Sequence, residues 1–361
     1  MSLVDNQRPL QPEYVPGSIT DRESERKALK QALNSIHLPN ILLHGPRGTG
    51  KTLLTRQLIT QLEDDIQHHY IDCIHHDTEH KALRKLHTSI TGEDTPQGFH
   101  TSKLQRKIEK QLKHVRHLIV LDEADFLLQN NGNSLLYYLS RINKPANLGI
   151  TIVSAHTASL QSQIDERTYS TLQPRRIGTE PYTSEQVYQI LSERARQSLE
   201  PTSLHHEALT YLASATENTK LGLHWLRHTA QNTSQPISEE TLKQTQKQAH
   251  HRFTERTRSH HTDHHRTLYK AIQDFDDYPV NSGQIYTTYR EHCRKRDLKP
   301  LSNRRISDYI QHLKLHPNTF SKPATTEPAP PNDTAVGIAP VIPPTTALVF
   351  NSSIARSIRT T

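Results

Sequence analysis

The stretch ILLHGPRGTGKTLL, residues 41–54, decides the fold. It consists of a short apolar run, a glycine-rich turn and the start of a helix, and the turn has the spacing GxxxxGKT. Glycines at this spacing let backbone N–H groups close around a phosphate at a helix N-terminus, where a lysine reaches the outer phosphates. The stretch predicts an ATP/ADP site made by Gly45, Pro46, Arg47, Gly48, Thr49, Gly50, Lys51, Thr52 and Leu53.

A second stretch, HLIVLDEADFLL at residues 117–128, supplies the other half of such a site. An apolar run typical of a buried strand ends in Asp122 and Glu123, as in a Walker B motif. Asp122, together with the Thr52 hydroxyl, would bind Mg²⁺. Glu123 would polarise the attacking water as a general base. A pair of acids beside a phosphate loop therefore predicts an ATP·Mg²⁺ site rather than a simple helix cap.

Short apolar runs alternate with helix-length segments over the first half of the chain. We expect strands at residues 40–44, 69–73, 117–121 and 149–154, and helices at 51–62, 79–90, 102–112 and 134–142. Thr101 or Ser102 is the expected cap of the third helix. This alternation is typical of a parallel sheet with helices on both faces. The predicted fold class is α/β, with a doubly wound P-loop sheet.

From about Tyr182 the apolar spacing becomes purely helical, which indicates a small all-α domain. Three further short helices, at residues 267–273, 283–294 and 302–315, suit a winged-helix fold. Residues 321–361 contain 7 of the 21 prolines and are expected to be disordered. The predicted organisation is an α/β domain at 1–180, an all-α lid at 181–249, a winged helix at 250–320 and a tail at 321–361.

Charge points to a polyanionic partner. The net charge is +7, and residues 251–318 contain 13 Lys and Arg against 8 Asp and Glu, so +5 of it lies in the C-terminal helical region. Such a concentration favours nucleic acid over other polyanions. Cys73 and Cys293 have no CxxC partner, and no signal peptide or membrane-spanning run is evident. We therefore expect a cytoplasmic, nucleoid-associated protein.

Several stretches together resemble one family, the archaeal AAA+ replication initiators related to the origin recognition complex and to cell division control protein six. The likeness begins with YVPGSITDRESE at 14–25 and continues through GPRGTGKT, LDEADFLL and LLYYLSRI. The most diagnostic run is IDERTYSTLQPRRIGTEPYTSEQVYQILSERA at 164–195, which generic P-loop proteins do not share. The resemblance implies an AAA+ nucleotide-binding domain with an all-α lid and a C-terminal winged helix.

The family's pattern assigns further roles to matching residues. The segment containing Val15 and Pro16 would pack near adenine. Tyr182 and Arg194 would line the nucleotide pocket from the lid. Arg167 is a candidate for contacting the γ-phosphate in a neighbouring subunit.

Two positions depart from the family's pattern. A polar sensor, usually Asn, ends the fourth strand in the family, whereas VSAHT offers Ser154 or His156 as the catalytic sensor. Lys220 occupies a lid position that is usually Arg, and it keeps the charge but loses the fork geometry. The sequence thus predicts ATP binding with weak ATPase activity at most.

The stretch SGQIYTTYREHCRKRDLKPLSNRRISDYIQHLKL, at 282–315, resembles the family's winged helix. Ser302 would cap a recognition helix whose buried stripe is Ile306, Tyr309, Ile310 and Leu313. That stripe would turn Arg304, Ser307 and Gln311 outward, and the candidate DNA contacts are Arg304, Arg305, Ser307, Lys295 and Arg296. HPNTFSKPATT follows where the family has a hairpin wing, so a wing is in question.

The predicted function is an ATP-binding replication initiator that recognises double-stranded origin DNA, with nucleotide state controlling DNA binding or assembly. Its expected partners are origin DNA, other initiator subunits and a replicative helicase. Two alternatives use the same motifs. One is an ATP-switched transcription regulator that binds promoters. The other is a plasmid replication factor that holds nucleotide with little hydrolysis.

Overall fold

The computed structural model describes residues 3–95, 98–112, 115–130, 132–146, 148–155, 160, 163–216, 218–259, 263–275 and 280–314. It leaves out the side chains of residues 143–146, 257–259, 304, 308 and 311–314. The chain divides into two compact units, Met1–Phe253 and Thr254–Thr361. Each unit is described separately below.

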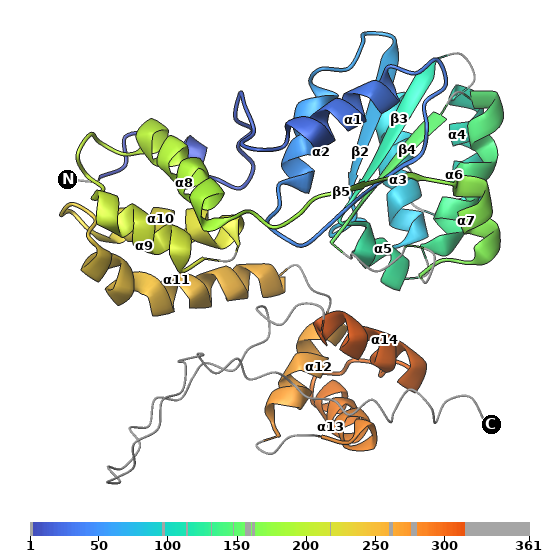
Figure 1. Ribbon diagram of the computed structural model, residues 1–361. Coiled ribbons are helices and arrows are strands. Elements are labelled where there is room, and N and C mark those ends of the chain that lie inside the picture. Colours follow the sequence, from blue (N-terminus) through green and yellow to red (C-terminus); the bar gives the residue numbers. More distant parts are fainter. Residues whose placement is uncertain are drawn as a thin grey trace, which may run out of the picture. The chain divides into compact units, whose positions relative to one another are not determined.

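The first unit contains a five-stranded parallel sheet in the order β2-β3-β4-β1-β5 (Figure 1). Its strands are β1 (Ile41–His44), β2 (Ile66–Asp72), β3 (Arg116–Asp122), β4 (Leu148–Ser154) and β5 (Arg175–Gly178). Because all strands are parallel, the turn after β1 and the acids at the end of β3 lie at the same edge of the sheet. Ligands bind at this edge in α/β folds.

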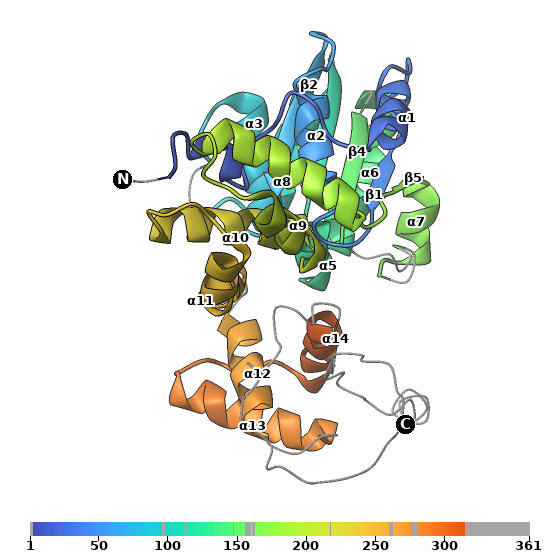
Figure 2. The same cartoon turned by 60° about the vertical axis from the view of Figure 1, so that its left-hand side comes forward.

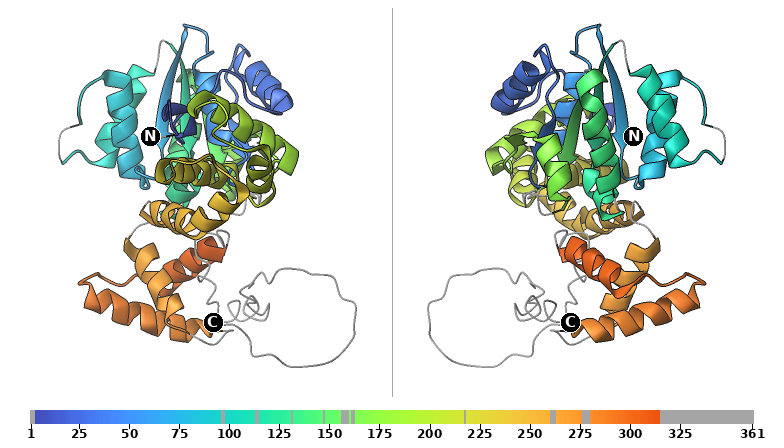
Figure 3. Two further views of the ribbon diagram at one scale, coloured as in Figure 1. Left: turned by 90° about the vertical axis from the view of Figure 1, so that its left-hand side faces the viewer. Right: turned by 90° about the vertical axis from the view of Figure 1, so that its right-hand side faces the viewer.

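Helices cover both faces of the sheet (Figure 3). One face packs against α1 (Glu23–Leu33) and α2 (Lys51–Ile59) through residues such as Leu118 and Val120. The other face, which includes Ile119 and Leu121, packs against α3 (Glu79–Thr91), α4 (Thr101–Gln111), α5 (Ala124–Gln129), α6 (Asn133–Ala146) and α7 (Glu166–Leu172). Successive residues of β3 therefore serve opposite layers, as the pleat requires.

A histidine pair lies between β2 and β3 on the α3 side. Nε2 of His69 is 3.1 Å from Nδ1 of His117, and Nδ1 of His69 is 2.9 Å from the Ser89 hydroxyl on α3. Both imidazoles are buried. Burial, with His117 and His68 nearby, lowers the pKa of His69 to about 4, and burial also lowers the pKa of His117. The pair is therefore neutral at neutral pH.

All four expected strands are present, and β2 begins three residues earlier than predicted. The fifth strand, β5, was not predicted, because only Ile177 of its four residues is buried and so no apolar run marks it. The expected cap of α4 is wrong: the N-cap is His100, and Thr101 is the first helical residue.

The lid is a separate cluster of helices (Figure 1), which Figure 2 shows from another side. It consists of α8 (Ser184–Ser198), α9 (His206–Ser214), α10 (Thr219–Asn232) and the first part of α11 (Glu239–Ser259). A capping box formed by Thr183 and Gln186 starts α8. The N-terminal residues also join this core: Leu3 and Leu10 are buried in it. Backbone bonds from Asp5 and Asn6 to the Ser198 carbonyl hold them there. The first residues of the predicted 1–180 domain thus pack with the lid helices.

The predicted boundary at residue 249/250 falls inside α11. Residues 239–259 contain neither Gly nor Pro, so the helix continues to Ser259 through the histidine- and arginine-rich stretch. The second unit then contains α12 (Asp263–Gln273), α13 (Ser282–Lys295) and α14 (Asn303–Lys314), all close to the predicted helices. Their shared core includes Leu268, Ile285, Tyr289, Ile306 and Tyr309. The segment HPNTFSKPATT, where the presence of a wing was in question, and the predicted tail lie outside the described residues.

Within the described residues, no helix has the length and apolar character required to cross a membrane.

Candidate functional site

The turn between β1 and α2 has the backbone geometry of a phosphate loop. Gly45, Gly48 and Gly50 have φ angles of 145°, 84° and 87°. Residues with a side chain rarely adopt such φ angles. Neighbouring atoms also occupy the space where a Cβ would lie. An added Cβ would lie 2.2 Å from the Thr179 carbonyl oxygen at Gly45 and 2.9 Å from the Tyr182 hydroxyl at Gly50. These positions of the loop therefore require glycine, as the GxxxxGKT spacing predicts.

Lys51 is the first residue of α2, and its side chain is buried beneath the loop. Its ammonium donates hydrogen bonds of 2.7 Å to the carbonyls of both Gly45 and Pro46. Burial lowers the pKa of Lys51 to about 8. A cation held inside a glycine turn is suited to meeting phosphate oxygens.

Asp122 ends β3 beside this lysine, and the residue is 3% exposed. Oδ1 accepts hydrogen bonds from the Thr52 hydroxyl at 3.2 Å and from the Glu123 N–H at 3.0 Å. Burial, followed by the charge of Glu123, raises the pKa of Asp122. A buried carboxylate next to a hydroxyl matches the hard oxygen ligands that Mg²⁺ prefers, so these two residues fit the predicted metal site.

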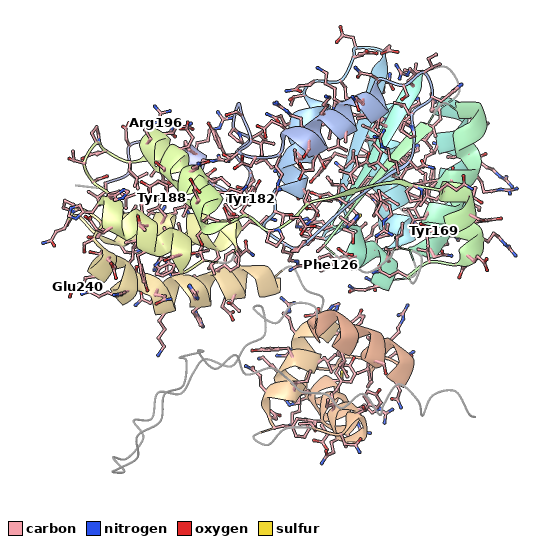
Figure 4. All side chains as sticks on the ribbon, in the orientation of Figure 1. Phe126, Tyr169, Tyr182, Tyr188, Arg196 and Glu240 are labelled. Atoms are coloured by element: carbon pink, nitrogen blue, oxygen red, sulfur yellow. The ribbon has the colours of Figure 1, made fainter. Side chains whose placement is uncertain are left out.

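Glu123 is the N-cap of α5 and adopts a left-handed backbone with φ of 52°. Its carboxylate lies 3.9 Å from the guanidinium of Arg47 in the loop and 3.9 Å from the ammonium of Lys220 on α10. Arg47 also lies over the ring of Phe126, which Figure 4 labels on α5. The structure thus brings together the predicted base and two cations, one from the loop and one from the lid.

The end of β4, where the sensor was predicted, is held by a residue that sequence reasoning missed. Asp125 accepts a 2.6 Å hydrogen bond from the Ser154 hydroxyl and a 2.7 Å bond from the Ala155 N–H. Ser154 therefore donates to a buried carboxylate of α5. His156, the other sensor candidate, lies outside the described residues. In the sequence, Asp125 is the fourth residue of the stretch DEAD, residues 122–125, and its place next to Asp122 and Glu123 could have identified it.

Two lid contacts converge on the loop. Tyr182, labelled in Figure 4 where the chain enters α8, lies under the guanidinium of Arg22, with 4.1 Å from Cζ to the ring centroid. Arg22 also donates to the Thr49 carbonyl at 3.1 Å and to the Glu180 carbonyl. Asn218, the N-cap of α10, lies against Gly48. Arg22 and Asn218 were not predicted, although Arg22 lies in the stretch YVPGSITDRESE.

Arg194 contacts the N-terminal segment. Its side chain is buried, donates to the Pro9 carbonyl at 3.2 Å and lies 4.6 Å from the ring centroid of Tyr14. Arg194 is therefore not a solvated helix charge. The Tyr14 hydroxyl donates to Gln197 at 2.8 Å, which also holds this segment, with Val15 and Pro16, against α8. The role of Val15 and Pro16 near adenine stays a prediction.

Arg167 is exposed on α7, a helix of the sheet face opposite to α1 and α2. It borders a hollow of about 420 Å³ that is also lined by Asn133, Ser134, Tyr137, Asp165 and Thr168. None of these residues belongs to the phosphate loop. A contact of Arg167 with a neighbouring subunit, as predicted, stays open.

The residues predicted to contact DNA belong to the second unit. Ser302 Oγ lies 3.5 Å from the Arg305 N–H at the start of α14, consistent with the expected cap. Lys295 and Arg296 are exposed at the end of α13, where Arg296 donates to Thr267 at 3.1 Å. The Arg304 side chain lies outside the described residues.

Ser307 differs from the prediction. It is half-buried, and its hydroxyl lies 2.6 Å from that of Tyr286 on α13. Helical periodicity placed Ser307 on the outward face, but the long Tyr286 side chain reaches past the edge of the buried stripe. Ser307 therefore supports the contact between α13 and α14.

Comparison with known proteins agrees with this arrangement. Residues 37–164 match the AAA domain family, and residues 264–316 match the C-terminal winged-helix domain of CDC6. An ORC1-type DNA replication protein of Pyrococcus abyssi is 28% identical, over 87% of this chain and 82% of that protein.

Solved structures share the fold. The structure of the Aeropyrum pernix ORC1 protein in complex with DNA has a TM-score of 0.70 at 24% identity, covering 87% of this chain and 88% of the other. The A. pernix ORC2 protein, in ADPNP–ADP complexes, has a TM-score of 0.60 at 17% identity, covering 86% and 90%. The chain thus contains an AAA domain and a C-terminal winged-helix domain of the CDC6 type, and over most of its length it is similar to archaeal ORC1-type DNA replication proteins.

Proposed function

We propose that this protein is an ATP-binding replication initiator that recognises duplex origin DNA through its winged helix, with nucleotide state controlling DNA binding or assembly. The observation that carries the proposal is the buried Lys51 inside a glycine turn beside the Thr52–Asp122 pair. This site belongs to the same chain as a basic three-helix unit of the CDC6 type. The likeness to ORC1-type replication proteins, one of which was solved in complex with DNA, supports DNA as the ligand.

Each residue of the site has a role in this proposal. The loop N–H groups and Lys51 would bind the phosphates, and Thr52 with Asp122 would hold Mg²⁺. When bound, Mg²⁺ neutralises charge on the phosphate oxygens. Glu123 would accept a proton from water as general base. The side chains of Arg47 and Lys220, which lie beside Glu123, would bind the outer phosphate.

Contacts from the lid would couple nucleotide binding to the position of the lid. Tyr182, Asn218 and Lys220 all come from the lid or its connection, and each approaches the loop or Glu123. Phosphates placed among these groups would interact differently with open and closed arrangements of the lid. A ligand that binds one arrangement better shifts the population toward it. Nucleotide occupancy therefore changes the lid, and through it the affinity for DNA or for another subunit.

Nucleotide binding is tested by Lys51→Ala. We expect this variant to lose measurable affinity for fluorescent ATP, because the buried phosphate-facing cation is gone. Lys30→Ala removes an exposed lysine of α1 and is the matched control, which should bind as the wild type does. Unchanged affinity in Lys51→Ala would reject the pocket.

DNA recognition is tested by replacing Arg304 and Arg305 together with Ala. Each lost phosphate contact lowers the slope of log affinity against log salt by about 1, so we expect a lower affinity and a slope reduced by as much as about 2. Arg196→Ala removes an exposed lid arginine and serves as control. Equal affinity and slope in the double variant and the wild type would exclude α14 as the DNA-reading helix.

A second candidate, a replication factor that holds nucleotide with little hydrolysis, is favoured by the bond from Ser154 to Asp125. That bond occupies a hydroxyl that would otherwise be available to orient water. Phosphate release measured with and without DNA separates the two functions: turnover that DNA stimulates supports the switching initiator.

A further inference from the structure

The two oxygens of the Asp122 carboxylate are held from different elements. Oδ1 accepts from Thr52 and from the Glu123 N–H, whereas Oδ2 accepts from the hydroxyl of Tyr70 on β2. Strand β2 pairs in parallel with β3, and Tyr70 lies opposite Val120. Tyr70 and Asp122 therefore project from the same sheet face as diagonal neighbours, a separation that an aromatic side chain can span.

Helix α2 supports this arrangement from above the sheet. Thr52 and Arg56 are four residues apart, so they lie on one face of α2. Thr52 contacts Asp122, and Cζ of Arg56 lies 5.5 Å from the ring centroid of Tyr70. The carboxylate is thus enclosed by α2 on one side and by β2 on the other.

We propose that Tyr70 is a positioning residue of the magnesium site: its hydroxyl holds Oδ2 so that Oδ1 faces the Thr52 hydroxyl. This inference rests on the proposed ATP·Mg²⁺ function. Outer partners that orient a metal-binding carboxylate affect metal affinity although they do not touch the metal. Without the Tyr70 hydroxyl, the Asp122 carboxylate would be held at Oδ1 alone and could rotate. Asp122 and Thr52 would then no longer be arranged in advance to bind the metal.

The test is the Mg²⁺ dependence of nucleotide binding in Tyr70→Phe, which keeps the ring and removes one hydroxyl. Affinity for fluorescent ADP is titrated against Mg²⁺ and measured separately in EDTA. We expect the Mg²⁺ concentration for half-effect to rise by about tenfold or more, with unchanged affinity in EDTA. Tyr138→Phe, which removes a hydroxyl bonded to the Gln105 carbonyl on α4, is the matched control and should leave both values unchanged.

A double-mutant cycle separates positioning from a general effect. If Tyr70 acts through Asp122, then Tyr70→Phe should change little in an Asp122→Asn background, because coupled residues are not additive. Additive effects, loss of the fold, or equal loss of affinity with and without Mg²⁺ would show that Tyr70 supports the sheet instead, and would overturn the inference. Wild-type protein that binds no nucleotide would refute the proposed function itself. Wild-type Mg²⁺ dependence that persists unchanged in Tyr70→Phe would refute only the inference.

Discussion

Gly48 in the phosphate loop lies against Asn218 of the lid, and Gly48→Ala tests that contact. An added Cβ would lie 2.4 Å from Oδ1 of Asn218 and 3.4 Å from its Cα. Ordinary contact begins near 3.4 Å, so the oxygen must move by about 1 Å. The same Oδ1 accepts the Lys220 N–H at 2.9 Å and caps α10. The substitution should therefore displace the start of α10 as well as strain the loop.

Gly98→Ala is a matched control for this change. Gly48 and Gly98 share a φ of 84°, but nothing lies within 4 Å of a Cβ added at Gly98. Both variants should lose about 1–2 kcal/mol from the left-handed backbone. Gly48→Ala should lose about 2 kcal/mol more, from the displaced cap and the crowded contact.

The fluorescence of Trp225 reports the result. It is the only tryptophan of the chain and lies fully buried on α10, so urea titration of its emission follows the unfolding of the first unit, which contains both the sheet and the lid. Asn218→Gly should partly rescue Gly48→Ala, because Gly is a tolerable N-cap and removes the clashing oxygen. The contact between Gly48 and Asn218 would be refuted if Gly48→Ala and Gly98→Ala lost the same free energy of unfolding and Asn218→Gly did not restore the stability of Gly48→Ala.

Three further predictions concern other parts of the molecule. Acidification from pH 7.5 to 5 should lower the free energy of unfolding by about 2 kcal/mol through His69 alone, because its pKa is about 4 when folded and about 6.5 when unfolded. Stability is lost as pH falls below 6.5, and urea titrations of His69→Gln should show that much less pH dependence; an unchanged dependence would exclude His69. Lys220→Ala should weaken binding of fluorescent ATP about tenfold more than that of ADP, because Lys220 lies beside Glu123 where the outer phosphate is expected; equal losses would contradict this placement. Asn281→Ala should destabilise α13 by about 1 kcal/mol, because Asn281 and Gln284 form its capping box. Amide hydrogen exchange in the first turn of α13 should therefore become faster, and an unchanged exchange rate would contradict the role of the cap.

Local motifs were predictable because their chemistry lies within a few consecutive residues. The phosphate loop follows β1 and precedes α2 directly, so its spacing and its flanks could be recognised together. Asp122 and Glu123 end an apolar run in the same way. The buried positions of α14, Ile306, Tyr309 and Ile310, followed from helical periodicity.

Contacts between distant segments were not predictable. Residue pairs such as Tyr14 and Gln197 are 183 positions apart, and no local pattern marks them. The N-terminal residues thus joined the lid core unexpectedly. Tyr70 was missed for a related reason, since its partner Asp122 becomes a neighbour only through strand pairing.

The central claim is that nucleotide occupancy of the loop controls the affinity of the same chain for duplex DNA. The most direct measurement is the affinity for a DNA duplex of one fixed sequence, with Mg²⁺·ATP, with Mg²⁺·ADP and without nucleotide, in the wild type and in Lys51→Ala. We predict that the wild-type affinity differs between these states and that the difference disappears in Lys51→Ala. A wild-type affinity that is the same in all three states would contradict the claim.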